Sequence, residues 1–302
     1  MKKYLTMGIM LGVILSLLIG TTGCKKEEKK ITLASKPMTE QFILAEILTQ
    51  LIQDKTDIIV EQKLGIGGGT SNIHPGLLSG EIDLYPEYTG TGWLFVLKKE
   101  LIRDKDELYK AVKDDYLKEF NVLWSGMYGF NNTYGLAVKN EVAKAYNLKT
   151  YSDLAKVSDK LIFCSNADFF EREDGFEGLK NTYEYKFKDI KEIDIGLKYS
   201  AIAANEVDII TVFSTDGNLE EAGLTVLTDD KNYFPSYHCA TLIKKETIDK
   251  YPEIEGVLEQ LTGQIQDEDM IKMNYLVDVK KEDPKAVAKE FLTKKGLLNA
   301  DY

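Results

Sequence analysis

Strand-like and helix-like stretches alternate along the chain from residue 31 onward, and this alternation constrains the fold more than any other feature. Residues 31–34 form a short apolar run typical of a strand, and apolar residues from Ile43 to Ile52 recur at helical spacing. Further strand candidates are 58–60, 135–138, 161–163 and 207–212. The pattern predicts an α/β fold. Because about 270 residues follow position 30, more than one core usually covers, we expect two lobes.

Local signals predict where several helices begin and end. Thr39 precedes the apolar stripe and is the expected N-cap of that helix. Residues 106–120 carry apolar side chains at four-residue intervals, which predicts an amphipathic helix. Asp283 and Pro284 predict the start of a C-terminal helix that stops at Gly296.

The glycine-rich segment 65–72 raises the question of a nucleotide site. It does not fit the dinucleotide-binding pattern GxGxxG, because Thr70 stands at the third glycine position. We expect a tight turn into a helix that is capped by Thr70, Ser71 or Asn72. The alternative is a helix N-terminus that helps to hold an anionic group.

The first residues are typical of a bacterial export signal. Lys2 and Lys3 precede the apolar stretch 5–19, which is shorter than the ~20 residues that a membrane span needs. Residues 21–24 resemble a lipobox, which implies cleavage before Cys24 and a lipid on its sulfur; the alternative is an ordinary secretory signal. The expected division is a signal peptide at 1–23 and a lipidated tether at 24–30. The lipid would be the only attachment to the membrane.

The acidic balance of the chain argues against a nucleic-acid partner. The sequence has 38 Lys and Arg against 49 Asp and Glu, a formal net charge of -11 at pH 7. Such a surface repels phosphate backbones, and no basic cluster with interleaved aromatic residues offsets it.

The remaining cysteines and the histidines do not predict a metal site or a cofactor. Cys164 and Cys239 are far apart in sequence, so they could form a bridge, but burial as small apolar residues is favoured. His74 and His238 have no paired spacing with cysteines or carboxylates, which disfavours zinc.

Four short aromatic segments, 85–91, 131–134, 212–216 and 234–237, each lie where an apolar run meets a turn. Segments in such positions can turn their rings into one cleft. A permanent cation without N–H donors suits such a cleft, because only the π faces of the rings can replace its lost water. The segments therefore predict a ligand of the quaternary ammonium class.

Several motifs follow one another in an order known from one protein family. They are 35–41, 67–72, 85–93, 130–135, 194–199, 213–217 and 234–237. In these motifs the chain resembles the quaternary-ammonium substrate-binding proteins of ABC importers, which capture glycine betaine, carnitine and choline. The resemblance implies an extracytoplasmic protein at the bacterial cell membrane, with a permease and an ATPase as partners.

The resemblance also implies a class II periplasmic-binding-protein fold, in which two α/β lobes are joined by two crossing segments. Lobe 1 would comprise 31–136 and 236–302, and lobe 2 would comprise 137–235. The ligand would lie between the lobes, and closure of the hinge over it would be the functional motion.

The ligand-binding residues that the resemblance implies are Lys36, Tyr88, Thr91, Asn132, Tyr134, Arg172, Phe213 and Tyr237. The four aromatic residues would form a cage; Phe213 stands where tyrosine is usual and keeps the π face without the hydroxyl. Lys36, Thr91 and Arg172 would meet the ligand carboxylate, and Asn132 would offer its backbone carbonyl to the methylated nitrogen. Without these roles, Lys36 would be a solvated lysine and Arg172 would pair with its acidic neighbours.

Two other classes of protein are disfavoured by what the sequence lacks. An enzyme is not expected, because there is no HExxH, no GxSxG and no Cys-His signature. A surface lipoprotein or adhesin without a small ligand is the alternative of another class, yet the sequence has neither repeats nor Ser/Thr-Pro stalks.

Within the class of binding proteins, the alternative ligand is ergothioneine, a trimethylated histidine derivative with a carboxylate and a thione-imidazole ring. That ring needs room and polar partners. Glu87, Glu171, Glu173 and Asp174 flank the inferred site and could supply them. The stretches that contain these residues are similar to those of some importers of that compound.

Overall fold

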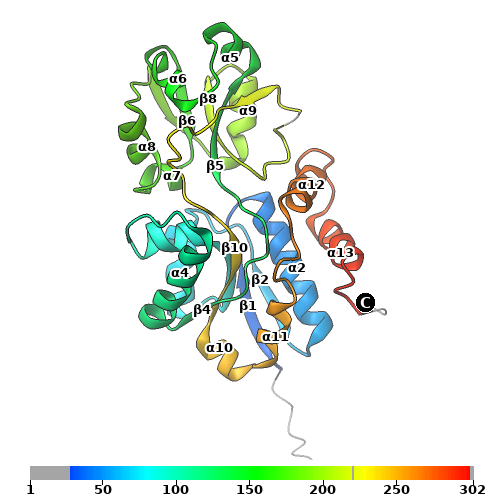
Figure 1. The fold of residues 1–302 in the computed structure, drawn as a ribbon. Helices are drawn as coiled ribbons and strands as arrows, with labels where there is room; N and C mark the ends of the chain where they lie inside the picture. The colour runs from blue at the N-terminus through cyan, green and yellow to red at the C-terminus, as the bar shows by residue number, and fades with distance from the viewer. Residues whose placement is uncertain (1–27, 220, 300–302) are drawn as a thin grey trace, which may run out of the picture.

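A computed structural model describes residues 28–219 and 221–299 of the 302-residue chain. These residues form two five-stranded sheets, each flanked by helices and lying one beyond the other along the long axis of the molecule (Figure 1). The predicted α/β fold class is confirmed. The predicted signal peptide and the lipidated Cys24 lie outside the described residues.

The first sheet has the strand order β2–β1–β3–β10–β4. Strand β1 is parallel to β2 and β3, whereas β10 is antiparallel to β3 and β4. Its strands are β1 (Lys30–Ala34), β2 (Ile59–Lys63), β3 (Leu84–Tyr88), β4 (Val122–Trp124) and β10 (Cys239–Lys244). This sheet therefore takes its last strand, β10, from the part of the chain that follows the whole second sheet.

The second sheet has the strand order β7–β6–β8–β5–β9. Strand β6 is parallel to β7 and β8, and β5 is antiparallel to β8 and β9. Its strands are β5 (Tyr134–Lys139), β6 (Ile162–Ser165), β7 (Asp189–Glu192), β8 (Ile209–Phe213) and β9 (Leu224–Val226). The strands predicted around 135–138, 161–163 and 207–212 are confirmed as β5, β6 and β8.

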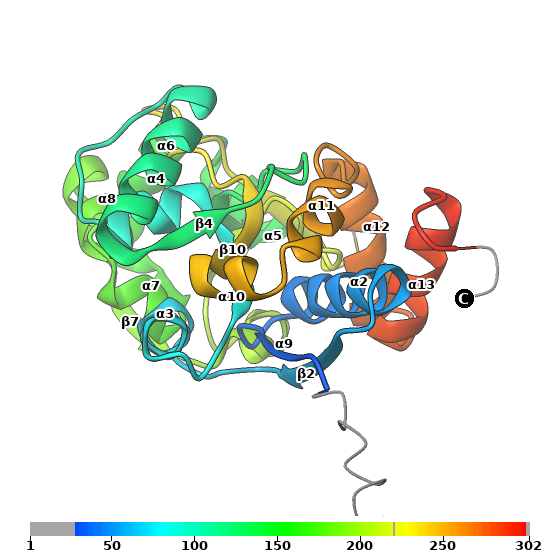
Figure 2. The same ribbon diagram turned by 90° about the horizontal axis from the view of Figure 1, so that it is seen from below.

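Helices surround each sheet, and α12 and α13 lie beside α2 (Figures 1 and 2). With the first sheet lie α2 (Thr39–Lys55), α3 (Thr70–Ser79), η1 (Thr91–Val96), α4 (Lys105–Phe120), α10 (Lys245–Lys250), α11 (Glu253–Glu259), α12 (Asp267–Asp278) and α13 (Pro284–Lys294). With the second lie α5 (Asn140–Tyr146), α6 (Tyr151–Ala155), η2 (Ser158–Lys160), α7 (Ala167–Glu171), α8 (Phe176–Tyr183), η3 (Ile195–Leu197) and α9 (Lys198–Ala203). The apolar stripe predicted for α2 is fully buried between the first sheet and helices α12 and α13.

Two predictions about helix starts are wrong. Met38, not Thr39, is the N-cap of α2; Thr39 is the first helical residue, and its hydroxyl donates to the carboxylate of Asp278 on α12. At α3 the N-cap is Gly69 with φ 55°, and none of the predicted side chains caps the helix. At α2 the Thr39 hydroxyl bonds a distant helix and not its own backbone, and at α3 a glycine with a positive φ stands at the N-cap position.

Other local predictions are confirmed. Helix α4 spans the predicted amphipathic segment, and at α13 the carboxylate of Asp283 accepts from the Lys285 backbone N–H. Gly296 follows that helix with φ 67°, in the left-handed region that favours glycine. Cys164 and Cys239 are both buried free thiols, as favoured over a bridge.

The chain crosses between the sheets twice, from β4 to β5 and from β9 back to β10. The two crossing segments run side by side, joined by an antiparallel bridge between Asn131 and His238. The backbone N–H of Asn132 donates to the carbonyl of Tyr237 at 3.1 Å. Residues on these segments are therefore held at the boundary between the two sheets.

Candidate ligand-binding site

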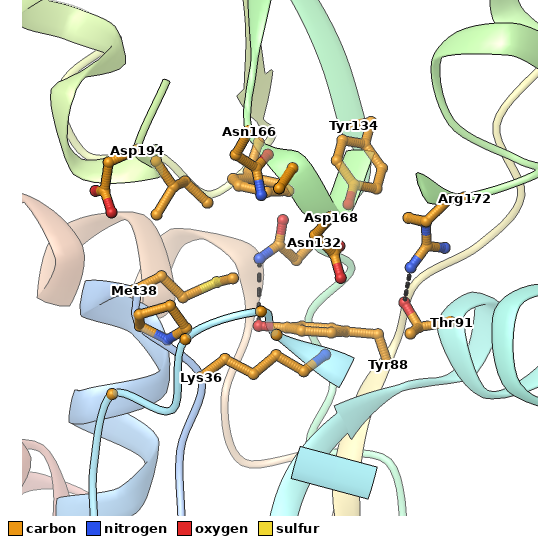
Figure 3. Close-up of a pocket in the computed structure, with 18 of the residues that line it drawn as sticks. Lys36, Met38, Tyr88, Thr91, Asn132, Tyr134, Asn166, Asp168, Arg172 and Asp194 are labelled. Carbon is orange, nitrogen blue, oxygen red and sulfur yellow. Dashed lines mark hydrogen bonds between the residues drawn. The ribbon is translucent and has the colours of Figure 1, made fainter. Parts of the chain in front are cut away.

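A pocket of about 470 Å³ lies at this boundary and is lined by residues from both sides (Figure 3). The eight residues predicted to bind ligand all line it: Lys36, Tyr88, Thr91, Asn132, Tyr134, Arg172, Phe213 and Tyr237. The fold thus brings together segments that are far apart in the sequence. Their part in binding a ligand stays a prediction.

Tyr134 packs against two of the other predicted cage rings, and the fourth ring faces it across the pocket. Tyr134 on β5 and Phe213 on β8 are paired across antiparallel strands, with ring centroids 5.0 Å apart. Tyr237 meets Tyr134 edge to face at 5.5 Å. Tyr88, the last residue of β3, lies opposite Tyr134 (Figure 3). Rings on both sides of a cavity can offer π faces to a cation between them.

Arg172 is buried beside these rings at 2% exposure. It forms a bidentate ion pair with Asp174, with Nε–Oδ1 and Nη2–Oδ2 distances of 2.9 and 2.5 Å, and its Nη1 donates to Thr91 Oγ1 at 3.1 Å. Its guanidinium carbon is 5.7 Å from the ring centre of Tyr134. Pairing with an acidic neighbour is therefore present, and the side chain lines the pocket as well. These bonds use three of the five N–H groups, so two remain for a ligand.

Lys36 is a buried residue and not a solvated one. Its Nζ lies 2.5 Å from Oε1 of Glu87, which is fully buried, and 5.0 Å from the ring centre of Tyr88. Glu87 also accepts from Thr70 Oγ1 at 3.0 Å. Each of the two cations at the pocket thus carries its own carboxylate partner, so their positive charges are largely compensated within the protein.

Asn132 reaches the pocket from the first crossing segment. Its Nδ2 donates to Glu40 Oε1 at 2.7 Å, while its buried Oδ1 has no hydrogen-bond partner. A buried oxygen without a donor is costly, and it can accept weak C–H hydrogen bonds from N-methyl groups. The side-chain oxygen is therefore a second candidate acceptor beside the predicted backbone carbonyl.

The acidic side of the pocket is made by residues that are not among those predicted to bind ligand. Among the described residues, the carboxylates that line it are Asp168, Glu192 and Asp194, whereas the four acidic residues predicted to flank the site do not line it. Two of those, Glu87 and Asp174, hold the pocket cations.

Asp168 is the carboxylate most enclosed in this pocket. Its Oδ1 is buried without a hydrogen-bond partner, and burial raises the pKa of the carboxyl. A Cβ on Gly69, at the N-terminus of α3, would lie only 2.8 Å from this oxygen, so the glycine permits the close approach. No sequence pattern marks this residue as part of a binding site.

Among the described residues, no group of three or more His, Cys, Asp and Glu side chains could hold a metal ion. No helix in the same part of the chain combines the length and apolarity that crossing a membrane requires.

Comparison with known proteins identifies the family. Residues 29–294 match the substrate-binding domain of ABC-type glycine betaine transport systems. A carnitine transport binding protein, OpuCC of Listeria monocytogenes, is 36% identical over 277 residues, which cover 91% of this chain and 89% of that protein. The ergothioneine transport permease/ergothioneine binding protein EgtU of Helicobacter pylori is 47% identical over 271 residues; these cover 90% of this chain and only 48% of that protein.

Solved structures agree with this family. The crystal structure of a glycine betaine/carnitine/choline ABC transporter protein matches with a TM-score of 0.71 and 31% identity, covering 90% of this chain and all of that one. Lactococcal OpuAC, closed on glycine betaine, matches with a TM-score of 0.63 at 16% identity, covering 89% of this chain and 96% of that one, and supports the fold alone. The predicted periplasmic-binding-protein fold is confirmed.

These relatives are transport proteins that bind substrate, and not enzymes, as expected. The family match spans nearly the whole described chain, and the relatives in Listeria and Helicobacter exceed 30% identity over about nine tenths of it. The protein belongs to the family of substrate-binding domains of ABC-type glycine betaine transport systems.

Proposed function

We propose that this protein captures a zwitterionic trimethylammonium compound in the pocket between the two sheets and delivers it to an ABC permease and its ATPase. The observation that carries the proposal is the convergence of four aromatic rings and two buried cations on one cavity. The rings would face the ammonium group, and the free N–H groups of Arg172 and Lys36 would meet the carboxylate.

The energies are consistent with such a ligand. A desolvated cation gains about 2 kcal/mol from a well-placed ring. Micromolar affinity needs about 8 kcal/mol after the costs of association, so four rings do not suffice without the carboxylate contacts. A zwitterion also adds no net charge to a pocket whose cations are already paired.

Calorimetric titration of the purified protein with glycine betaine, carnitine, choline and ergothioneine tests this proposal. Tyr134→Ala should weaken binding of the best ligand roughly tenfold or more, since it removes a cage ring. Tyr146→Ala removes an exposed tyrosine away from the pocket and should leave affinity unchanged. If the purified protein binds none of the four ligands, the result would instead support the adhesin alternative.

Asp168 favours ergothioneine over the smaller betaines as the physiological ligand. A quaternary ammonium group has no N–H to give the unpartnered Oδ1, whereas an imidazole-thione ring has N–H donors. A charge-assisted hydrogen bond to a buried carboxylate contributes about 1.5–3 kcal/mol. The 47% sequence identity with the ergothioneine-binding protein of Helicobacter pylori also favours ergothioneine.

The substitution Asp168→Asn distinguishes ergothioneine from glycine betaine by its effect on their affinities. The variant should weaken ergothioneine roughly tenfold relative to glycine betaine, because only ergothioneine donates to the carboxylate. An equal change for both ligands would rule out this assignment. Asp194→Asn, at another lining carboxylate, is the matched control.

We also propose the predicted attachment and hinge. Lipid on Cys24 would hold the tether 24–30 at the extracytoplasmic face of the membrane, and Cys24→Ala should release the protein from the membrane fraction. Lobe 1 (31–136 and 236–302) and lobe 2 (137–235) would close about the crossing segments. Small-angle scattering should then show a smaller radius of gyration with ligand than without.

A further inference from the structure

Glu40 is a buried carboxylate in the first turn of α2 that collects donors from four separate segments. Its Oε1 accepts from Tyr88 Oη at 2.6 Å and from Asn132 Nδ2 at 2.7 Å. Its Oε2 accepts from Thr215 Oγ1 at 2.6 Å and from Asn274 Nδ2 at 3.3 Å. One oxygen thus holds two residues of the ligand pocket, and the other holds the loop after β8 and helix α12.

The direction of these hydrogen bonds is fixed. Gln41 Nε2 donates to Tyr88 Oη at 3.1 Å, so the tyrosine hydroxyl is left to donate to Glu40. The amide groups of Asn132 and Asn274 can only donate through nitrogen. An ionised carboxylate accepts all four bonds, and a carboxamide at position 40 would face donors with a donor.

Thr215 lies in the loop after β8, a strand of the second sheet, and makes two hydrogen bonds to side chains that are packed with the first sheet. Its hydroxyl donates to Glu40, and its backbone carbonyl accepts from Asn274 Nδ2 at 2.8 Å. Two residues on, Gly217 lies directly against α12: a Cβ there would be 2.3 Å from the backbone nitrogen of Tyr275. The loop therefore fits α12 only because this residue has no side chain.

We propose that Glu40 and helix α12 form a latch for loop 214–217, and that Glu40 is the positioning residue that couples latch closure to the placement of Tyr88 and Asn132 in the pocket. The inference rests on the proposed function, because it assigns this contact to the retention of the trimethylammonium ligand. Glu40, Thr215 and Gly217 do not line the ligand pocket within the described chain. When the lobes part, Oε2 exchanges Thr215 for water, and the support of Tyr88 and Asn132 weakens with it.

Ligand dissociation rates test the latch. Thr215→Val removes one donor to a charged acceptor, which should raise the dissociation rate of the best ligand roughly tenfold with little change in the association rate. Glu40→Gln and Gly217→Ala should do the same, the first by opposing donors and the second by a clash with α12. Matched controls are Glu46→Gln on the same helix and Gly256→Ala, where a Cβ meets no atom within 4 Å.

A purely structural role would not give this kinetic result. It predicts a lower thermal midpoint with unchanged dissociation in the folded fraction. If Thr215→Val and Gly217→Ala both release ligand at the wild-type rate, the latch is wrong even where Glu40→Gln fails to fold. If wild-type protein binds none of the betaines, the proposed function itself fails.

Discussion

Arg172→Lys is the substitution that most sharply tests how the ligand carboxylate is held. The planar guanidinium group of Arg172 hydrogen-bonds Asp174 and Thr91 and keeps two further N–H groups for a ligand. Lysine keeps the positive charge but cannot hold Asp174 in two places and still reach the ligand. The loss of a bidentate charge-assisted contact costs about 1.5–3 kcal/mol, so affinity for glycine betaine should fall roughly ten- to a hundredfold.

Choline provides the internal comparison, because it carries the trimethylammonium group without a carboxylate. Calorimetric titration should show a much smaller loss for choline than for glycine betaine or carnitine in the same variant. Arg103→Lys, at the exposed arginine that donates to the Asn232 carbonyl, controls for the chemistry of the exchange. Equal losses for choline and glycine betaine would refute the assignment of Arg172 to the carboxylate.

Three further predictions concern the surroundings of the pocket. Burial lowers the pKa of His74 to about 4, so the unfolded state binds more protons below pH 6.5, and the free energy of unfolding should fall by up to about 3 kcal/mol toward pH 4. Denaturant titrations should show a flatter pH dependence for His74→Gln. Gly69→Ala, with its Cβ 2.8 Å from Asp168 Oδ1 at φ 55°, should weaken binding of every ligand in the titration panel. Phe213→Tyr should change betaine affinity less than threefold, because the π face is retained.

Residues at the ends of strands could be predicted because local pattern determines them. Tyr134 begins β5 and Phe213 ends β8, so the strands predicted at 135–138 and 207–212 already placed two rings at sheet edges, whereas the strand that Tyr88 ends, β3, was not predicted. Pairing of Tyr134 with Phe213 then followed from the antiparallel register, which the sequence alone did not indicate. The resemblance to a family supplied the remaining pocket residues.

Features that depend on partners from distant segments could not be predicted. Thr39 has the chemistry of an N-cap, but Asp278 on α12 takes its hydroxyl. Glu40 looked like any acidic residue in a first helical turn, because none of its partners lies near it in sequence. Asp168 could not be predicted for the reverse reason: its significance is an oxygen without a donor, which only the packed structure reveals.

The most direct test of ring-held cation binding exchanges the charged nitrogen for carbon. Glycine betaine and 3,3-dimethylbutanoate have the same shape and carboxylate, and only the first carries the onium charge. If the rings of Tyr88, Tyr134, Phe213 and Tyr237 bind that charge, calorimetry should show the carbon analogue binding roughly a hundredfold more weakly. Equal affinity for the two compounds would contradict the account.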